Sequence, residues 1–125
     1  MTKNVSRFIA PAAVLVLVGC ADKAPDVSFK ADVQPVLEHY CAECHKPGGD
    51  GAAASGFVVD GYNSVMAGGK LGPMVVPGDA LSSNLYRLVA GKVHPSIAMP
   101  HGKERLPAED VEKIKAWIDQ GARDN

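Results

Sequence analysis

The apolar positions of residues 28–40 repeat with the spacing of an α-helix. Five side chains would share one face of this helix: Phe29, Val33, Val36, Leu37 and Tyr40. Ser28 stands where an N-cap is expected, because its hydroxyl can accept a hydrogen bond from the first turn. Pro35 lacks an amide hydrogen, so it either kinks the helix or marks its true first turn. The pattern predicts a helix that leads directly into residues 41–45.

The last part of the chain gives the clearest helical pattern. Four apolar residues form one stripe along it: Val111, Ile114, Trp117 and Ile118. Pro107 suits the first helical turn, and Glu109 and Asp110 complement the positive end of the helix. Gly121 is a natural C-cap. These features predict a terminal helix that buries one face.

The middle of the chain has weaker signals. Short helices are predicted near Tyr62–Ala67 and Ser83–Val89, the second capped by Ser82 or Ser83. Residues 46–59 are rich in Gly and Ala and are expected to be loop. Residues 68–79 are rich in turn-forming residues, and residues 91–106 show no clean period. No segment reads convincingly as a strand or a repeat, so we expect a small all-α domain whose long loops need something to pack against.

The first residues have the pattern of an export signal. Lys3 and Arg7 precede an apolar run from Phe8 to Val18. That run is too short to cross a hydrocarbon core of about 30 Å as a helix. It ends in Leu-Val-Gly-Cys, which resembles the bacterial lipobox, with Cys20 as the acylated residue. The alternative is a plain secretory signal followed by a chance cysteine.

The lipobox reading divides the chain into three parts. Residues 1–19 are a lipoprotein signal peptide, residues 20–27 a lipidated tether, and residues 28–125 the folded domain. A lipid on Cys20 would anchor the protein to a membrane surface without spanning it. We therefore expect a location in the bacterial periplasm. Ala21 follows the cysteine, which resembles the outer-membrane default and slightly favours that membrane.

Composition narrows the classes of partner. The 125 residues have room for one domain, and aromatic residues make up only 6%. A small chain with few aromatic residues often depends on a staple, a metal or a cofactor. Loss of Lys3 and Arg7 with the signal would change the formal net charge from −1 to −3. No basic stripe is present, so a nucleic acid partner is not expected.

Residues 41–45 read CAECH and hold two of the three cysteines. A redox disulfide would need this pair at a helix N-terminus after a strand, whereas here it follows a helical stretch. A structural zinc site would need four ligands. The chain has no second CxxC, and His39 or His94 would complete such a site only with loose spacing.

Covalent haem attachment is the interpretation that uses all three residues of the motif. The thiols of Cys41 and Cys44 add to porphyrin vinyl groups and form thioethers, and His45 is then held where its Nε2 can bind iron. With an export signal and an aromatic-poor helical chain, the spacing favours one covalently bound haem c.

The chain also resembles a known family at this point. CAECH, Ala98-Met99-Pro100 and the terminal EKIKAWIDQGA are similar to segments of class I c-type cytochromes. The closer likeness is to single-haem domains of bacterial lipoproteins and multidomain oxidoreductases, through FKADVQPVLEHYCAECH and VVPGDALSSNLYRLV. It covers about residues 28–122. It implies a small cytochrome c-like fold, with N- and C-terminal helices packed together and long loops around the haem.

The resemblance implies Met99 as the second axial ligand of the iron. Met99 lies 54 residues after His45, on the extended loop before the last helix. Pro100 follows it and cannot be drawn into a helix. A methionine thioether also suits a c-type iron.

Other residues remain alternatives for this second ligand position. Met74 precedes a turn-rich loop and is the runner-up. His94 and His101 flank the favoured methionine, and either would lower the reduction potential if it bound iron. His39 lies on the first helix, where it would struggle to reach the distal face, and Met66 fits the apolar side of a short helix.

Two supporting roles follow from the resemblance. The second ring nitrogen of His45 needs an acceptor, and the resemblance implies the carbonyl of Pro47. Trp117 is expected to pack the terminal helix against the first helix near the haem edge, opposite Phe29 or Tyr40.

These residues predict an electron carrier and not an enzyme. A haem with histidine and methionine ligands has no open site, so we expect redox partner proteins and no small-molecule substrate. The carrier would work at a membrane surface, alone or as a subunit of an oxidoreductase. One alternative is a haem-based gas or peroxide sensor, or a small catalyst, with a labile distal ligand. Another is a haem-free metal-binding or thiol lipoprotein. GGKLG lacks the Gly-Lys-Ser/Thr of a phosphate-binding loop.

Overall fold

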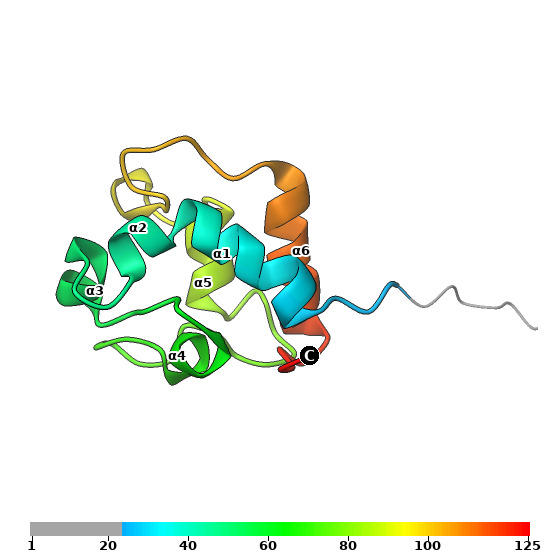
Figure 1. Cartoon of the computed structure of the whole chain (residues 1–125). Coiled ribbons are helices and arrows are strands. Elements are labelled where there is room, and N and C mark those ends of the chain that lie inside the picture. Colours follow the sequence, from blue (N-terminus) through cyan, green and yellow to red (C-terminus); the bar gives the residue numbers. More distant parts are fainter. Residues whose placement is uncertain (1–23) are drawn as a thin grey trace, which may run out of the picture.

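The computed structural model describes residues 24–125. The expected signal peptide and Cys20 lie outside this range. The described residues form six α-helices: α1 (Gln34–Tyr40), α2 (Ala42–His45), α3 (Asp50–Ser55), α4 (Tyr62–Ala67), α5 (Asn84–Val89) and α6 (Ala108–Asp119) (Figure 1). Two further helical turns are η1 (Phe29–Val33) and η2 (Pro95–Ile97). Within this range there is no strand, only an isolated bridge between Gly69 and Gly72, so the predicted all-α class is confirmed.

The predicted first helix is present but begins with a wider turn. Ser28 caps it as expected, since its hydroxyl accepts a hydrogen bond from the amide of Ala31. Residues Phe29–Val33 form a π-helix, and the α-helix starts at Gln34 with Pro35 in its first turn. Proline needs space at the carbonyl four residues earlier and donates no hydrogen bond. The wider π turn ahead of α1 suits both requirements.

The terminal helix packs against these first turns. Helix α6 lies beside η1, and the rings of Phe29 and Trp117 are 5.2 Å apart between centroids. Tyr62 of α4 completes the aromatic group with an edge-on contact to Phe29 at 5.3 Å. Phe29 and Trp117 are both about 1% exposed. The predicted packing of the N- and C-terminal helices is therefore observed.

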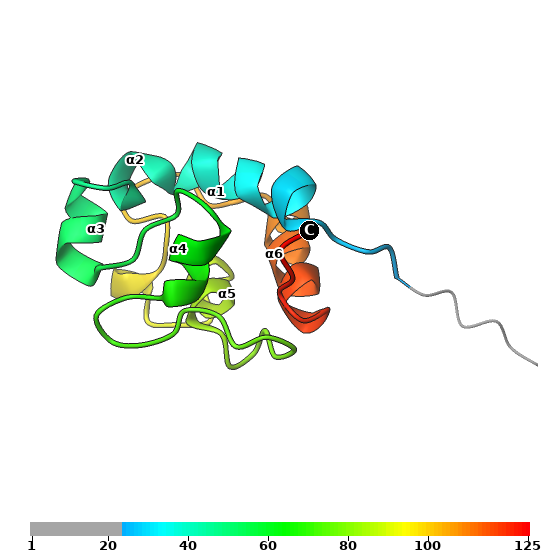
Figure 2. The ribbon, with the colours of Figure 1, turned by 60° about the horizontal axis from the view of Figure 1, so that its bottom comes forward.

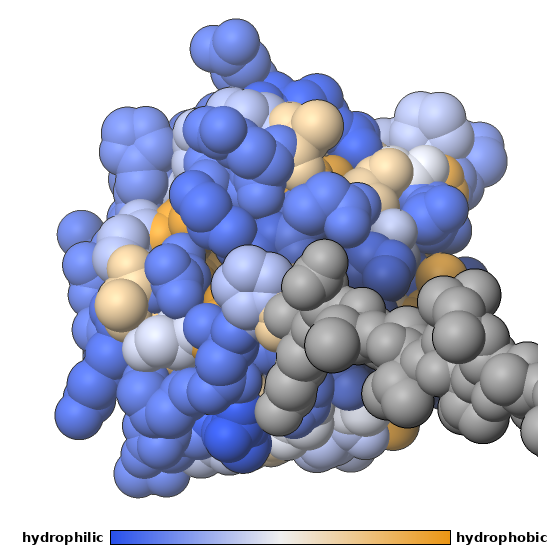
Figure 3. Space-filling model, turned by 90° about the vertical axis from the view of Figure 1, so that its right-hand side faces the viewer, coloured by the Kyte–Doolittle hydropathy of each residue, from blue (hydrophilic) through white to orange (hydrophobic). Residues whose placement is uncertain are grey.

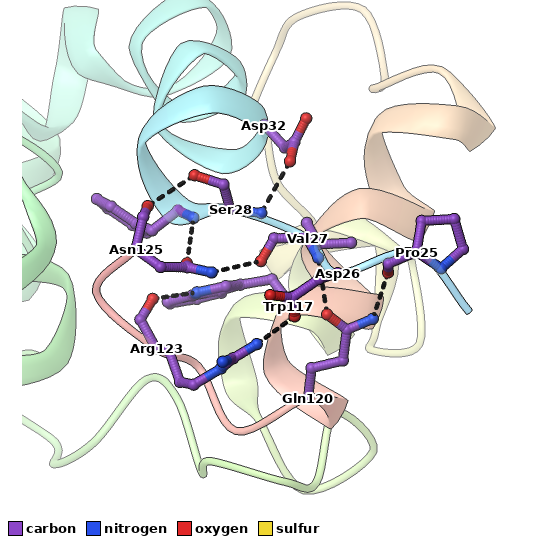
Figure 4. A network of polar contacts seen from close by, with 10 residues as sticks. Pro25, Asp26, Val27, Ser28, Asp32, Trp117, Gln120, Arg123 and Asn125 are labelled. Carbon is purple, nitrogen blue, oxygen red and sulfur yellow. Dashed lines mark hydrogen bonds and ion pairs between the residues drawn. The ribbon is translucent and has the colours of Figure 1, made fainter. Parts of the chain in front are cut away.

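A polar network closes over this aromatic group (Figure 4). The side chain of Gln120 accepts from the amide of Val27 at 2.8 Å and donates to the carbonyl of Pro25 at 2.9 Å. Asn125 accepts from the amide of Phe29 at 2.9 Å, and Trp117 donates its indole N–H to the carbonyl of Arg123. The segment that enters the domain is thereby fixed to the one that ends it.

The Gly- and Ala-rich segment contains a helix, contrary to our expectation that residues 46–59 are loop. Helix α3 spans Asp50–Ser55 and includes three alanines, which have the highest helix propensity. It ends at Gly56, whose φ of 73° is left-handed and favours glycine. The glycines of this segment suggest a loop, but the alanines between them are strong helix formers and decide the structure.

The two other short helices occur where the pattern predicts them. Helix α4 has the predicted bounds, and α5 begins one residue after Ser83. Ser83 does not cap α5 with its side chain, however. Its buried hydroxyl donates to the carbonyl of Asp79 at 2.8 Å and accepts from the amide of Val76 at 2.8 Å. It therefore holds the preceding turn closed, while α5 packs against α6.

The helices and loops lie in two groups, one at each end of the molecule. Helices α2 and α3 and the loop that includes η2 lie at one end, and the entering segment and α6 lie at the other (Figures 1 and 2). The face from which the N-terminal segment leaves is largely hydrophilic, with scattered apolar patches (Figure 3). No helix in residues 24–125 has the length and apolar character needed to cross a membrane.

Candidate functional site

The three residues of the CxxCH motif lie on one short helical turn. Cys41 ends α1, and its carbonyl accepts hydrogen bonds from the amides of Cys44 and His45, at 3.2 and 2.9 Å. The turn places the two cysteines and the histidine along the wall of one cavity. The end of the first helix thus delivers the whole motif to one place, as the sequence predicts.

This cavity has a volume of about 820 Å³, within the range of about 300–1,000 Å³ that is usual for ligand pockets. Its walls come from α2, α3, α5 and the two long loops. Apolar side chains dominate the rest of the lining, among them Leu71, Met74, Leu85, Leu88, Val89, Val93, Ile97 and Met99. The long loops therefore enclose a site for a large apolar molecule.

One nitrogen of His45 is fixed by the chain. His45 Nδ1 lies 2.9 Å from the carbonyl oxygen of Phe57, and the two rings meet edge-on at 5.7 Å. A carbonyl can only accept, so Nδ1 carries the hydrogen and Nε2 is left with its lone pair, as a metal ligand requires. The His45 carbonyl also accepts from the amide of Val59 at 2.9 Å. The acceptor is therefore Phe57 and not Pro47, which corrects the expectation taken from the resemblance.

Gly51 leaves room beside the other nitrogen. A Cβ atom added to Gly51 would lie 3.0 Å from both Nε2 and Cε1 of His45, and 3.0 Å from the carbonyl oxygen of Cys44. Such contacts are tighter than nearly all real Cβ contacts. A side chain at position 51 would therefore crowd the edge of the His45 ring that carries Nε2.

Sequence reasoning missed both Phe57 and Gly51. Phe57 acts through a backbone carbonyl, which any residue type carries, so its side chain gave no signal. Gly51 lies in a glycine-rich segment that was interpreted as loop. If α3 is predicted as a helix, Gly51 stands out, because a glycine inside a helix is unfavourable unless packing or function requires it.

The two thiols are free and differ in exposure. Cys41 is partly buried, and burial, followed by the proximity of Cys44, raises the pKa of its thiol to about 11. The thiol is therefore neutral near pH 7, unlike the stabilised thiolate of a redox CxxC motif. Among residues 24–125, no three His, Cys, Asp or Glu side chains are grouped to hold a metal ion, so the zinc interpretation finds no ligand set there.

Only some of the candidates for the second iron ligand line the cavity. Met99, Met74 and His101 line it, whereas His94, His39 and Met66 do not. The backbone of Met99 is attached to the end of α5, because its amide donates to the carbonyl of Leu88 at 3.1 Å. His94 instead pairs its ring with the hydroxyl of Ser96 at 2.8 Å.

Trp117 does not belong to this site. It does not line the cavity, and its ring contacts Phe29 and Tyr62 at the terminal-helix end. The expectation that it packs near the haem edge is wrong in position, although the packing of the last helix against the first is right. Tyr40 does line the cavity and contacts His39.

An ion pair joins the motif to the methionine loop. Glu43, between the two cysteines, pairs with Lys103. The hydrogen bond from Lys103, followed by its charge, lowers the pKa of the Glu43 carboxyl, and the same bond raises the pKa of Lys103. Both side chains are largely exposed, so this pair orients the loop more than it stabilises the fold.

Residues 41–101 match the family described as Planctomycete cytochrome C. The chain carries a cytochrome c domain. The match begins at the first cysteine of the motif and ends two residues after Met99. It therefore includes the three helices and most of the two loops that form the walls of the cavity. Searches of curated proteins and of solved structures gave no match. The family match and the helical structure of residues 24–125 together confirm the predicted cytochrome c-like fold.

The cytochrome c domain implies a covalently bound haem c, and the residues of the cavity fit it. Cys41 and Cys44 would supply the two thiols, and His45, whose Nε2 lies beside Gly51, would supply the ligand nitrogen. The apolar walls suit the faces of a porphyrin. Haem c supplies an iron that cycles between the ferric and ferrous states. The chain would supply the ligands and, through the carbonyl of Phe57, the orientation of the ring of His45.

Proposed function

We propose that this protein is a single-haem electron carrier with His45 and Met99 as axial ligands. The observation that carries the proposal is that both residues line one apolar cavity, with Nδ1 of His45 held by the carbonyl of Phe57. With both axial positions filled by side chains, no site is left for a substrate. The family match supports electron transfer as the role of the domain.

Two features favour Met99 over His101 as the second ligand, whereas only the sequence resemblance favours it over Met74, which is likewise partly buried and bound through its carbonyl to the amide of Leu85. The loop around Met99 is attached at both ends, by the bond from its amide to Leu88 and by the pair between Lys103 and Glu43. Met99 is also partly buried, whereas His101 is exposed. A thioether ligand favours the ferrous form and raises the reduction potential, which suits a carrier.

The carrier is further proposed to work at a bacterial membrane surface in the periplasm. The pattern of residues 1–20 supports this, since a lipid on Cys20 would hold the domain there. Encounters with redox partner proteins would then be confined to that surface. Each encounter should be weak, because a carrier must leave after each transfer.

The visible spectrum of the domain tests the ligands. The protein would be made in cells that attach haem c, and the oxidised form would be examined for the far-red band of a methionine–ferric iron bond. Met99→Ala should abolish that band, while Met74→Ala and His101→Ala should keep it.

Other outcomes would reassign the second ligand. A band that survives Met99→Ala and disappears in Met74→Ala makes Met74 the ligand. A low-spin spectrum without the band in the unmodified protein points to His101. A high-spin spectrum contradicts the carrier and supports the sensor with a labile ligand. Intact mass separates all of these from a haem-free protein, because attached haem adds a fixed mass.

A further inference from the structure

The large apolar side chains that are exposed in the described part of the chain form two pairs. Leu71 and Ile97 line the cavity and belong to the site already described. Val76 and Leu81 are 40% and 65% exposed and do not line that cavity. We call residues 76–81 the apolar loop. The proposed electron-transfer site does not explain why its apolar side chains face solvent.

The backbone of the apolar loop is fixed by hydrogen bonds. The carbonyl of Val76 accepts from the amide of Asp79 at 3.0 Å and closes a tight turn. Pro77 and Gly78 are its central residues, and the φ of 85° at Gly78 is left-handed, which favours glycine there. The buried hydroxyl of Ser83 binds both ends of the turn, as described above. A loop that is already ordered loses little conformational entropy when its side chains make a contact.

The apolar loop and the entering segment meet at the end of α6. The amide of Gly78 donates to the carbonyl of Ile118 at 2.7 Å, and the amide of Ala80 donates to the carboxylate of Asp119 at 2.9 Å. The next residue, Gln120, binds the entering segment through its side-chain amide. Three consecutive residues of the chain therefore hold both segments, and the loop runs beside this end of α6 (Figure 2).

The proposed lipid anchor would lie close to the same end. The stretch from residue 20 to residue 24 spans at most roughly 14 Å, so a lipid on Cys20 would keep the end of α6 near the bilayer. The exposed side chains of the loop, Pro77 among them, are too few to bury the roughly 800 Å² per partner of a stable protein complex. A contact made by a domain that is already anchored is intramolecular, so a weak apolar contact with lipid is sufficient.

The charges at this end favour a lipid surface without net charge. Lys115 is paired with Asp119 at 2.7 Å, and Arg123 is paired with Asp26. The apolar loop itself contains one charged residue, the acidic Asp79. The loop therefore brings no cation that would attract lipid phosphate, and its carboxylate would be repelled by an anionic surface.

We propose that the apolar loop inserts Val76 and Leu81 into the lipid surface to which Cys20 is anchored. This rests on the lipid of the proposed function and not on the haem. The two side chains lie at the boundary between headgroups and acyl chains, about 5–10 Å deep, as other interfacial apolar faces do. The lipid and the loop together then give two points of contact, which fix how the domain is oriented on the membrane.

A spin label on the apolar loop tests this contact. The lipidated, haem-loaded protein with Leu81→Cys would be labelled and bound to phosphatidylcholine vesicles, which have no net charge. Lipid on Cys20 and haem on Cys41 and Cys44 leave the introduced thiol free for the label. Ala53→Cys is the matched control, because Ala53 is exposed on α3 at the opposite end and does not line the cavity.

Electron paramagnetic resonance compares collisions of the label with oxygen, which concentrates in hydrocarbon, and with a water-soluble nickel complex. The ratio of oxygen to nickel collisions should be high at position 81 and low at position 53. Adding Val76→Asp to the Leu81→Cys protein should lower the ratio to that of the control, because a buried charge is costly. Equal ratios at the two positions would overturn the proposal. A ratio that stays high with Val76→Asp would also overturn it, because the label itself would then be entering the lipid.

Intact mass distinguishes a failure of the loop contact from a failure of the anchor. A protein without lipid on Cys20 contradicts the proposed membrane location, and the inference fails with it before any vesicle is added. A lipidated protein whose label at position 81 stays in water keeps the anchor and overturns the loop contact alone. A high ratio that appears only after anionic lipid is added contradicts a surface without net charge and overturns the proposal as well.

Discussion

At the terminal-helix end, Phe29, Tyr62 and Trp117 pack ring against ring, and side-chain amides bind the backbone of both chain ends. At the cavity end, short helices and loops surround a space of about 820 Å³. The first end is complete with protein atoms alone, and all buried side-chain polar atoms of the described residues have partners. The second end is shaped around its cofactor. The two ends should therefore respond differently to substitution.

Removing the thiols should have the largest effect. In Cys41→Ala/Cys44→Ala, haem cannot be joined to the chain, and the cavity end loses its central contacts. Covalent attachment holds the haem at a high effective concentration, and a ligand held at about 1,000 times its dissociation constant contributes about 4 kcal/mol to the stability of the folded state. For a domain of this size that corresponds to a fall in melting temperature on the order of 15 °C or more.

Thermal unfolding and intact mass check this expectation. Glu43→Gln, between the two cysteines, is the control and should keep haem and nearly all the stability. If the double variant has the same melting temperature as the unmodified protein, the cavity end is stable without its cofactor.

Trp117→Ala tests the opposite end. Truncating a buried tryptophan typically costs about 3–5 kcal/mol, and Trp117 is about 1% exposed. Because the ring does not line the cavity, the haem spectrum of the folded variant should not change. Chemical denaturation monitored by circular dichroism measures the loss. A changed axial-ligand band with little loss of stability would contradict the separation of the two ends.

Gly51→Ala tests the cavity end without replacing a proposed ligand. The new methyl group would lie 3.0 Å from Nε2 of His45, and such overpacking typically costs about 1–3 kcal/mol. Its better helix propensity offsets about 1 kcal/mol of that cost. We expect a shifted reduction potential, because the histidine ring must move. Gly61→Ala is the control, since a Cβ there meets nothing within 4 Å and the potential should stay constant.

Glu43→Gln should have the smallest effect, and one that depends on pH. The folded-state pKa of Glu43 is lowered, so its contribution is present above the ordinary carboxyl pKa of 4.5 and is lost as pH falls through the lowered value. The difference in melting temperature between variant and unmodified protein should therefore be small at pH 7 and vanish in acid. A difference that grows in acid would assign Glu43 another partner.

The sequence predicts the terminal-helix end well because its signals are local and repetitive. Phe29, Leu37, Ile114 and Ile118 recur at helical spacing, and all four are buried. The attachment motif is equally local, since its three residues lie on one turn. Its spacing, together with the export signal and the aromatic-poor helical chain, predicts covalent haem.

The remainder of the site depends on long-range geometry. Phe57 approaches His45 through a backbone carbonyl, and no residue type encodes that contact. Met74 and Met99 line the same cavity although they are far apart in the chain, so spacing cannot rank them. Helix α3 was missed because its glycines concealed a run of alanines.

The fixed entry of the chain gives the domain a direction. Val27 is bound to Gln120 at the end farthest from α2 and α3, so the chain enters the domain at the terminal-helix end (Figure 1). A fully extended stretch from residue 20 to residue 24 reaches at most roughly 14 Å. With the proposed lipid on Cys20, the domain would present its cavity end away from the point of attachment. A redox partner would then meet the cavity end from the side opposite the anchor.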